Sequence, residues 1–132
     1  MTPFAKILLD GNLRSYQPGQ MLAGQFSLED SSPGQVRACE LSVLWHTEGK
    51  GDEDLSVHYF QRIEPAADES LDFRQPRRFS TLLPNSPLTY HGSIVKIVWC
   101  VRVRFFINRG KDVSLEVSFQ LGALPRVELR TA

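Results

Sequence analysis

Alternation of apolar and polar residues constrains this chain more than any other feature of its sequence. From residue 95 to 107, and again from 113 to 121, every second residue is Val, Ile, Leu, Phe or Trp. A period of two is that of a β-strand, whose successive side chains point to opposite faces of a sheet. Helical periodicity is nearly absent from the rest of the chain, so we predict an all-β fold.

Clusters of Pro, Gly, Asn and Asp divide the sequence into strands. We expect strands over 4–9, 20–28, 36–48, 54–63, 71–83, 94–107 and 113–121, with an eighth, Pro-containing edge strand over 124–130. The segment 71–83 forms one bent strand or two short ones interrupted at Pro76, and 65–70 forms a loop or one helical turn. Strands this numerous, with no internal repeat, predict one Greek-key two-sheet β-sandwich over residues 1–132.

Two hairpins are expected from matching apolar faces. Pairing 36–48 with 54–63 about Gly51 places Trp45 opposite Val57, Val43 opposite Tyr59, Cys39 opposite Ile63 and Glu40 opposite Arg62. Pairing 94–107 with 113–121 about Gly110 places Arg104 opposite Glu116. Within strand 20–28, Gly24 shares a face with apolar residues, and a glycine inside a strand predicts a bulge or a close approach of other backbone.

The composition limits the class of partner. The chain has 132 residues, with 15 Lys plus Arg and 15 Asp plus Glu, so its formal charge is zero. We therefore expect no general attraction to nucleic acid or anionic lipid. The N-terminal apolar run is too short for a signal peptide, and no run is long enough to span a membrane. We expect a cytoplasmic protein in which Cys39 and Cys100 stay reduced.

No motif for catalysis or cofactor binding is present: the sequence has no Gly-rich phosphate loop, no nucleophile elbow and no His-Glu-x-x-His. We therefore predict a non-enzymatic chain without a cofactor. In the first register His46 and His58 lie diagonally on the outer face of one hairpin, where a surface metal site is conceivable, but we expect solvated histidines and no metal. We likewise expect the acidic turn 52–54 to be a solvated hairpin tip rather than a calcium site.

Positive charge is concentrated locally. Lys96, Arg102 and Arg104 share one strand face, and Arg78 lies upstream with two further arginines. These four residues are our candidates for binding an acidic peptide, a phosphate or a membrane headgroup, because Arg binds oxyanions with a bidentate fork. The alternative is that Glu116 and its neighbours neutralise an ordinary wet sheet face.

Three apolar side chains, those of Phe60, Val98 and Phe106, are expected on outward faces. They pack under a loop or form an association surface. An edge strand with exposed aromatics also suits strand addition by a peptide or by a second copy of the chain.

A series of turn and strand residues has a recognisable order: Tyr16, Pro18, Gly19 and Gly24, then Phe79, Leu83, Pro84, Pro87, Tyr90 and Gly92 before the strand that runs to Trp99. Together these residues resemble the amino-terminal domain of arrestin-like proteins. The family includes α-arrestins, the retromer cargo subunit and bacterial sporulation-control proteins. The resemblance implies an immunoglobulin-like sandwich that acts as an adaptor in cargo or receptor handling. Lys6 has no second lysine beside it, so we do not expect recognition of receptor phosphates.

We therefore expect a protein-binding or scaffolding module. One alternative is a sandwich that binds carbohydrate or a small ligand, with exposed aromatics such as Tyr90 as platforms. Another is a hydrolase-like enzyme, which would need a concave pocket that holds His91 together with an acid.

Overall fold

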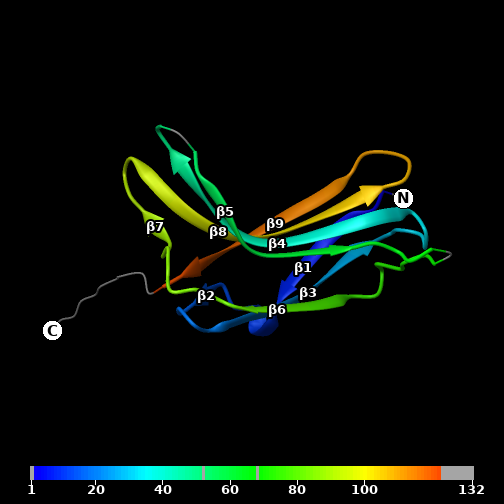
Figure 1. Ribbon diagram of the computed structural model, residues 1–132, viewed down its shortest axis with the longest axis horizontal. Coiled ribbons are helices and arrows are strands. Elements are labelled where there is room, and N and C mark those ends of the chain that lie inside the picture. The colour runs from blue at the N-terminus through cyan, green and yellow to red at the C-terminus, as the bar shows by residue number, and fades with distance from the viewer. Residues whose placement is uncertain (1, 52, 68, 123–132) are drawn as a thin grey trace.

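The computed structural model describes residues 2–51, 53–67 and 69–122. Its elements are β1 (Phe4–Leu9), the short 3-10 helix η1 (Asp10–Asn12), β2 (Ser15–Tyr16), β3 (Met21–Glu29), β4 (Val36–Gly49), β5 (Leu55–Ile63), β6 (Arg77–Leu82), β7 (Tyr90–His91), β8 (Val95–Ile107) and β9 (Val113–Leu121) (Figure 1). The all-β prediction is confirmed. Within the described ranges, no helix has the length and apolar character that a membrane span requires.

The strands form two sheets that pack face to face. The smaller sheet has the order β1-β3-β6, and the larger has the order β2-β9-β8-β4-β5 with β7 paired to β8. Figure 1 shows the larger sheet bent, with the first part of β8, beside β7, turned away from the smaller sheet. The chain crosses between the sheets from β3 to β4 and from β5 to β6, which is the sandwich connectivity expected.

The core lies between the two sheets and is rich in aromatic rings. Phe26 of the smaller sheet contacts Phe105 of the larger one, and the Phe105 ring packs edge-on against Phe73 at 5.3 Å. Trp99 is fully buried, and its indole N–H donates to the carbonyl oxygen of Pro87 at 2.8 Å. Burying each such side chain contributes roughly 1.5–3 kcal/mol.

Most strand boundaries match the sequence prediction to within one residue. Residues 71–76 do not form a strand: β6 begins only after Pro76, which has no N–H to donate to a ladder. Phe73 still accepts a hydrogen bond from the backbone N–H of Leu28 at 2.8 Å and buries its ring. The two-residue strands β2 and β7 were not predicted. The strand expected over 124–130 lies outside the described residues.

The first hairpin is confirmed over half its length. Glu40 pairs with Arg62 and Val43 with Tyr59, as predicted. The pairing of Trp45 with Val57 is wrong, because the register shifts after Val43 and Val57 pairs with Leu44 instead. A β-bulge of this kind leaves one residue of β5 without a partner, and it reverses the facing of the β5 residues that precede it, Leu55 to Val57, relative to the predicted register.

The unpaired residue of the bulge is His58, which therefore does not lie on the outer face as predicted. Its Nε2 is 2.7 Å from the carbonyl oxygen of Leu82, on the last residue of β6. Its ring packs edge-on against Trp99 at 6.1 Å. His58 thus faces the smaller sheet and bridges the two layers.

The second hairpin has the predicted faces but a different register. Arg102, rather than Arg104, pairs with Glu116, and Arg104 pairs with Ser114. The shift is two residues, which leaves every side chain on its predicted face because the strand period is two. Asp112 explains the shift, since its carboxylate accepts hydrogen bonds from the backbone of Ile107 and from Arg104 and so closes the turn.

Gly24 allows β1 to approach β3 closely, as predicted from its place inside a strand. A Cβ atom at this position would lie 2.5 Å from the carbonyl oxygen of Leu8 and 3.2 Å from the Phe79 ring. Both neighbours are held by the smaller sheet, so neither can move without disturbing strand pairing.

We predict that Gly24→Ala lowers the free energy of unfolding by about 1–3 kcal/mol through overpacking. Denaturant titration followed by tryptophan fluorescence measures the change. Ser80→Ala, on the exposed face of the same sheet, is the control and should shift stability by less than about 0.5 kcal/mol. Equal stability of Gly24→Ala and the wild type would show that β1 does not pack as described.

Candidate functional site

The larger sheet has an outer face that no other described strand or helix covers, and the candidate site lies there. We call the outer face the side of β5, β4, β8 and β9 opposite the core. On β8 it carries alternate residues, namely Lys96, Val98, Cys100, Arg102, Arg104 and Phe106, which pair with Glu48, His46, Leu44, Ser42, Glu40 and Ala38 of β4. Leu44 and Cys100 are buried even on this side.

Three of the four predicted basic residues share the outer face, and two of those three are paired with carboxylates. The Arg102 Nε donates to Glu116 at 2.6 Å, and Arg104 donates to Asp112 at 3.0 Å. Lys96 is exposed and forms no ion pair with any residue of the described ranges. The interpretation of a neutralised sheet face therefore holds for Arg102 and Arg104.

Arg78, the fourth candidate, lies on the opposite side of the sandwich. It pairs with Gln25 on the exposed face of the smaller sheet and donates to the carboxylate of Asp10 at 2.8 Å. This hydrogen bond from Arg78 lowers the pKa of Asp10. A surface that includes Arg102 and Arg104 therefore cannot also include Arg78, and the four residues do not form one site.

A cluster of arginines around Phe106 occupies one end of the outer face. The guanidinium groups of Arg104, Arg37 and Arg62 lie 4.6, 5.3 and 5.4 Å from the centre of the Phe106 ring. We call these four residues the arginine cluster. Cations favour the face of an aromatic ring because its π electrons give that face a partial negative charge. Phe106 was predicted to face outward, but Arg37 and Arg62 were not among the predicted site residues.

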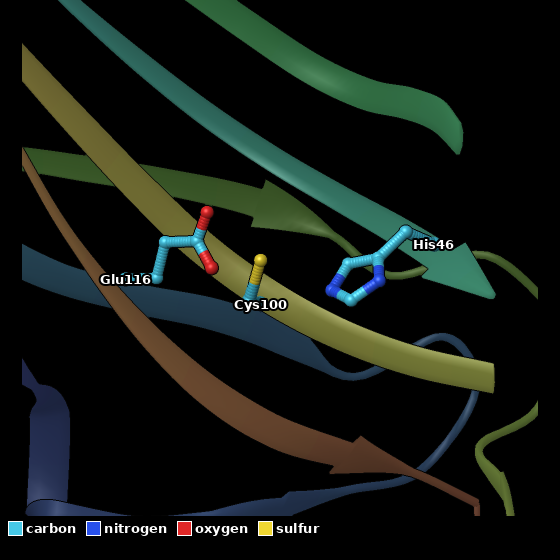
Figure 2. A group of neighbouring side chains, drawn as sticks. All are labelled: His46, Cys100 and Glu116. Carbon is cyan, nitrogen blue, oxygen red and sulfur yellow. The ribbon is translucent and has the colours of Figure 1, made fainter. Parts of the chain in front are cut away.

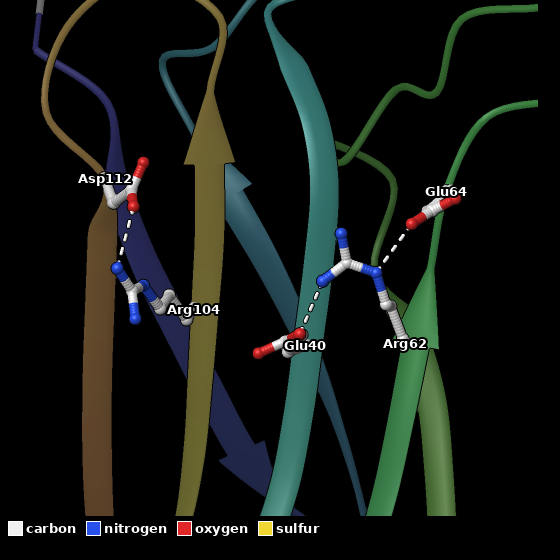
Figure 3. Close-up of polar contacts among 5 residues, drawn as sticks. All are labelled: Glu40, Arg62, Glu64, Arg104 and Asp112. Atoms are coloured by element: carbon white, nitrogen blue, oxygen red, sulfur yellow. Dashed lines mark hydrogen bonds and ion pairs between the residues drawn. The ribbon is translucent and has the colours of Figure 1, made fainter.

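Carboxylates hold two of these arginines in place (Figure 3). Arg62 bridges Glu40 and Glu64, with its Nε 2.6 Å from Glu64, while Arg104 is bound by Asp112. Hydrogen bonding to Glu64 and then to Glu40 raises the pKa of Arg62, and the Arg104 hydrogen bond lowers that of Asp112. Exposed ion pairs of this kind contribute about 0–1 kcal/mol each, so they orient the cluster more than they stabilise the fold.

Three potential metal ligands meet at the middle of the outer face (Figure 2). His46 of β4, Cys100 of β8 and Glu116 of β9 each offer one ligand atom, and these atoms lie within 4.8 Å of one another. Sequence reasoning placed His46 with His58 and missed Cys100 and Glu116 as neighbours. The signal was present, since all three occupy outward positions of adjacent strands, but their proximity depends on the register of the second hairpin.

Two hollows adjoin these groups. One of about 330 Å³ is lined by His46, Glu53, Asp54, Leu55, Arg102 and Glu116. Another of about 340 Å³ contains His91, and its lining of described residues includes Arg14 and Ser15 but no carboxylate. The acid that a His91-based hydrolase would need is thus absent from that lining.

The cysteines lie on opposite faces of the larger sheet, and both are free thiols. Burial is the main cause that raises the pKa of Cys39 to about 12 and that of Cys100 to about 11. Both thiols are therefore protonated at neutral pH, and the expectation of reduced cysteines agrees with the structure.

Comparison with known proteins shows the fold and no family. No protein-family model matches the chain, and no curated protein is similar to it. Among solved structures it is similar to Spo0M, a sporulation control protein from Bacillus subtilis, with a TM-score of 0.65 and 15% sequence identity. The match covers 92% of this chain and 50% of the Spo0M chain, so the described sandwich spans about half of that protein. The arrestin-like two-sheet fold is thereby confirmed.

We predict that both thiols react slowly in the folded protein. Because each pKa is raised, the reactive thiolate fraction near neutral pH is small, and alkylation by iodoacetamide should be about a hundredfold or more slower than in the denatured chain. Mass spectrometry of samples quenched at successive times measures the rate at each cysteine. Fast labelling of Cys100 in the folded state would contradict the burial described here.

Proposed function

We propose that the chain is a non-enzymatic protein-binding module that docks an acidic or phosphorylated segment of a partner on the outer face of its larger sheet. The arginine cluster is the observation that carries this proposal. The fold supports it further, because Spo0M, which has the same two-sheet architecture, is described as a sporulation control protein. A regulatory role of that kind suits a module that works by binding.

The cluster combines an apolar contact with three oriented cations. Arg37 forms no ion pair with any of the described residues, so its guanidinium is open to an incoming anion. Arg62 and Arg104 already hold carboxylates, and a partner's carboxylate or phosphate exchanges with these at little cost because the existing pairs are exposed. Arg recognises such groups with two parallel hydrogen bonds. The Phe106 ring adds apolar contact between them.

The alternatives have less support from the geometry. A carbohydrate platform needs aromatic rings on one surface, but Tyr90 pairs with Ile97 on the core side of β8, whereas Phe60 pairs with Ser42 on the outer face. The two rings therefore do not share a binding surface.

We predict that Arg37→Ala with Arg104→Ala reduces partner capture by about tenfold or more, since a hydrogen bond to a charged group contributes about 1.5–3 kcal/mol. The measurement is quantitative mass spectrometry of proteins that co-purify with the tagged chain at native expression. Arg74→Ala with Arg78→Ala is the matched control, because it removes the same charge away from the outer face. Equal loss in both variants, or none in either, would contradict the proposed surface.

A second surface, at the edge of the larger sheet, favours self-association. β5 is the last strand in the sheet order, so one of its edges has no neighbouring strand among those described. The bulge turns Leu55 and Val57 outward, and they are exposed by 54% and 48% beside Phe60 at 53%. An unpaired edge with exposed apolar side chains can add a strand from a second copy.

We predict that the wild-type chain sediments as a dimer at micromolar concentration and that Val57→Lys shifts it to monomer, because a charge on an edge strand blocks pairing. Analytical ultracentrifugation measures the mass. Leu88→Lys changes a similarly exposed apolar residue outside β5 and serves as the control. A monomeric wild type, or a dimer unaffected by Val57→Lys, would rule out pairing through β5.

A further inference from the structure

The meeting of His46, Cys100 and Glu116 follows from the strand registers. Cys100 pairs with Leu44 on one side and with Ser118 on the other. His46 is the next outward residue after Leu44 on β4, and Glu116 is the outward residue before Ser118 on β9. Each therefore lies diagonally next to Cys100, one from each flanking strand, and Figure 2 shows the Cys100 sulfur between the other two side chains.

We propose that His46, Cys100 and Glu116 bind one Zn²⁺ ion on the outer face of the larger sheet. A thiolate sulfur, an imidazole nitrogen and a carboxylate oxygen are the three ligand types that zinc takes in proteins. Soft sulfur with imidazole favours zinc over calcium or magnesium, which prefer oxygen. Three protein ligands leave the fourth tetrahedral position open to water or to a group from a partner.

The spacing of the ligand atoms fits such an ion after small side-chain rotations. Around tetrahedral zinc, ligand atoms lie about 3.3–3.6 Å apart, given bonds of about 2.0–2.3 Å. Here they lie within 4.8 Å of one another, on strands whose backbones are fixed by pairing. Cys100 is buried and provides a fixed ligand, whereas the side chains of His46 and Glu116 are 22% and 46% exposed and have solvent beside them.

A neighbouring arginine orients one of the three ligands, and a carboxylate lies near another. Arg102 donates to Oε2 of Glu116 at 2.6 Å, which leaves Oε1 for the metal. The carboxylate of Glu48 lies 3.9 Å from Nδ1 of His46, beyond hydrogen-bond distance, and a rotation of its exposed side chain would let it accept a hydrogen bond from Nδ1–H when Nε2 binds the ion. Zinc ligands in proteins are commonly held by outer contacts of both kinds.

The adjoining hollow gives a cation a route to the site. Glu53 and Asp54 line it together with His46 and Glu116, and Arg102 is the one cationic side chain among the described residues of its lining. Three carboxylates against one guanidinium make the local potential negative, which attracts a divalent cation. Glu53 and Asp54, two residues of the acidic turn that sequence reasoning considered alone, thus line a hollow beside a site built from strand residues.

Cobalt(II) tests the proposal, because it replaces zinc and its bond to a thiolate absorbs in the near ultraviolet. Untagged, reduced and chelator-treated protein is titrated with cobalt chloride, then with zinc chloride to displace it. We expect one equivalent of cobalt to produce the thiolate band and one equivalent of zinc to abolish it. Zinc should also raise the midpoint temperature of thermal unfolding, because the ion binds the folded state.

Single substitutions identify the ligands. Cys100→Ser should abolish the band, and His46→Gln and Glu116→Gln should each weaken cobalt binding by about tenfold or more. His91→Gln and Glu64→Gln change the same residue types elsewhere and should bind cobalt like the wild type. Circular dichroism checks that each variant is folded, and the exposed side chain of Glu116 keeps the test valid if Cys100→Ser unfolds.

Three results would overturn the proposal. They are the absence of a thiolate band in the wild type, unchanged affinity in His46→Gln or Glu116→Gln, and equal weakening in the two control variants. This test does not involve the arginine cluster, so its result bears on the metal site alone and leaves the proposed partner surface to be tested separately.

Discussion

The antiparallel pairing of β4 with β8 is the interaction on which the rest of the structure depends. These are the two longest strands, and they pair from Val36 opposite Ile107 to Gly49 opposite Val95. One side of the pair carries the core residues of the larger sheet, including Leu41, Val103 and Trp99. The other side carries both candidate sites, so the same hydrogen-bond ladder positions the hydrophobic core and the functional surface.

The core face and the outer face of the β4–β8 pair differ in the kinds of side chain that they tolerate. The core face packs against a second sheet, where a lost methylene group leaves a cavity that the structure cannot refill. No other described strand or helix packs against the outer face. It therefore tolerates ion pairs such as Arg102 with Glu116, a buried thiol at Cys100 and aromatic rings at Phe60 and Phe106. Charged, thiol and aromatic side chains can therefore be placed on the outer face without disturbing the packing of the core.

The sequence predicted the strands and their faces well, because alternation is a local property of each segment. It did not predict the register of the second hairpin. Shifting the register by two residues keeps every face and still sets an arginine opposite Glu116, so apolar matching and charge pairing could not choose between the two. The choice matters for the site. In the predicted register Cys100 would lie opposite Gln120, four residues along β9 from Glu116, so Cys100 and Glu116 could not bind the same metal ion. The bulge at His58 was also hidden, because Leu55, Val57 and Tyr59 alternate in the sequence without a break although the extra residue places Leu55 and Val57 on the opposite face from Tyr59.

The sequence by itself determined that the chain is an all-β sandwich, that Gly24 marks a bulge or a close backbone approach and that Lys96, Arg102 and Arg104 share a face. These depend on side-chain period, backbone sterics and turn chemistry, which act over a few residues. Only the tertiary structure decided that Arg78 binds Asp10 on the opposite side, that three arginines surround Phe106 and that His46 meets Cys100 and Glu116. Such contacts join residues from different strands, and they are set by the packing energy of the whole sandwich rather than by any local pattern.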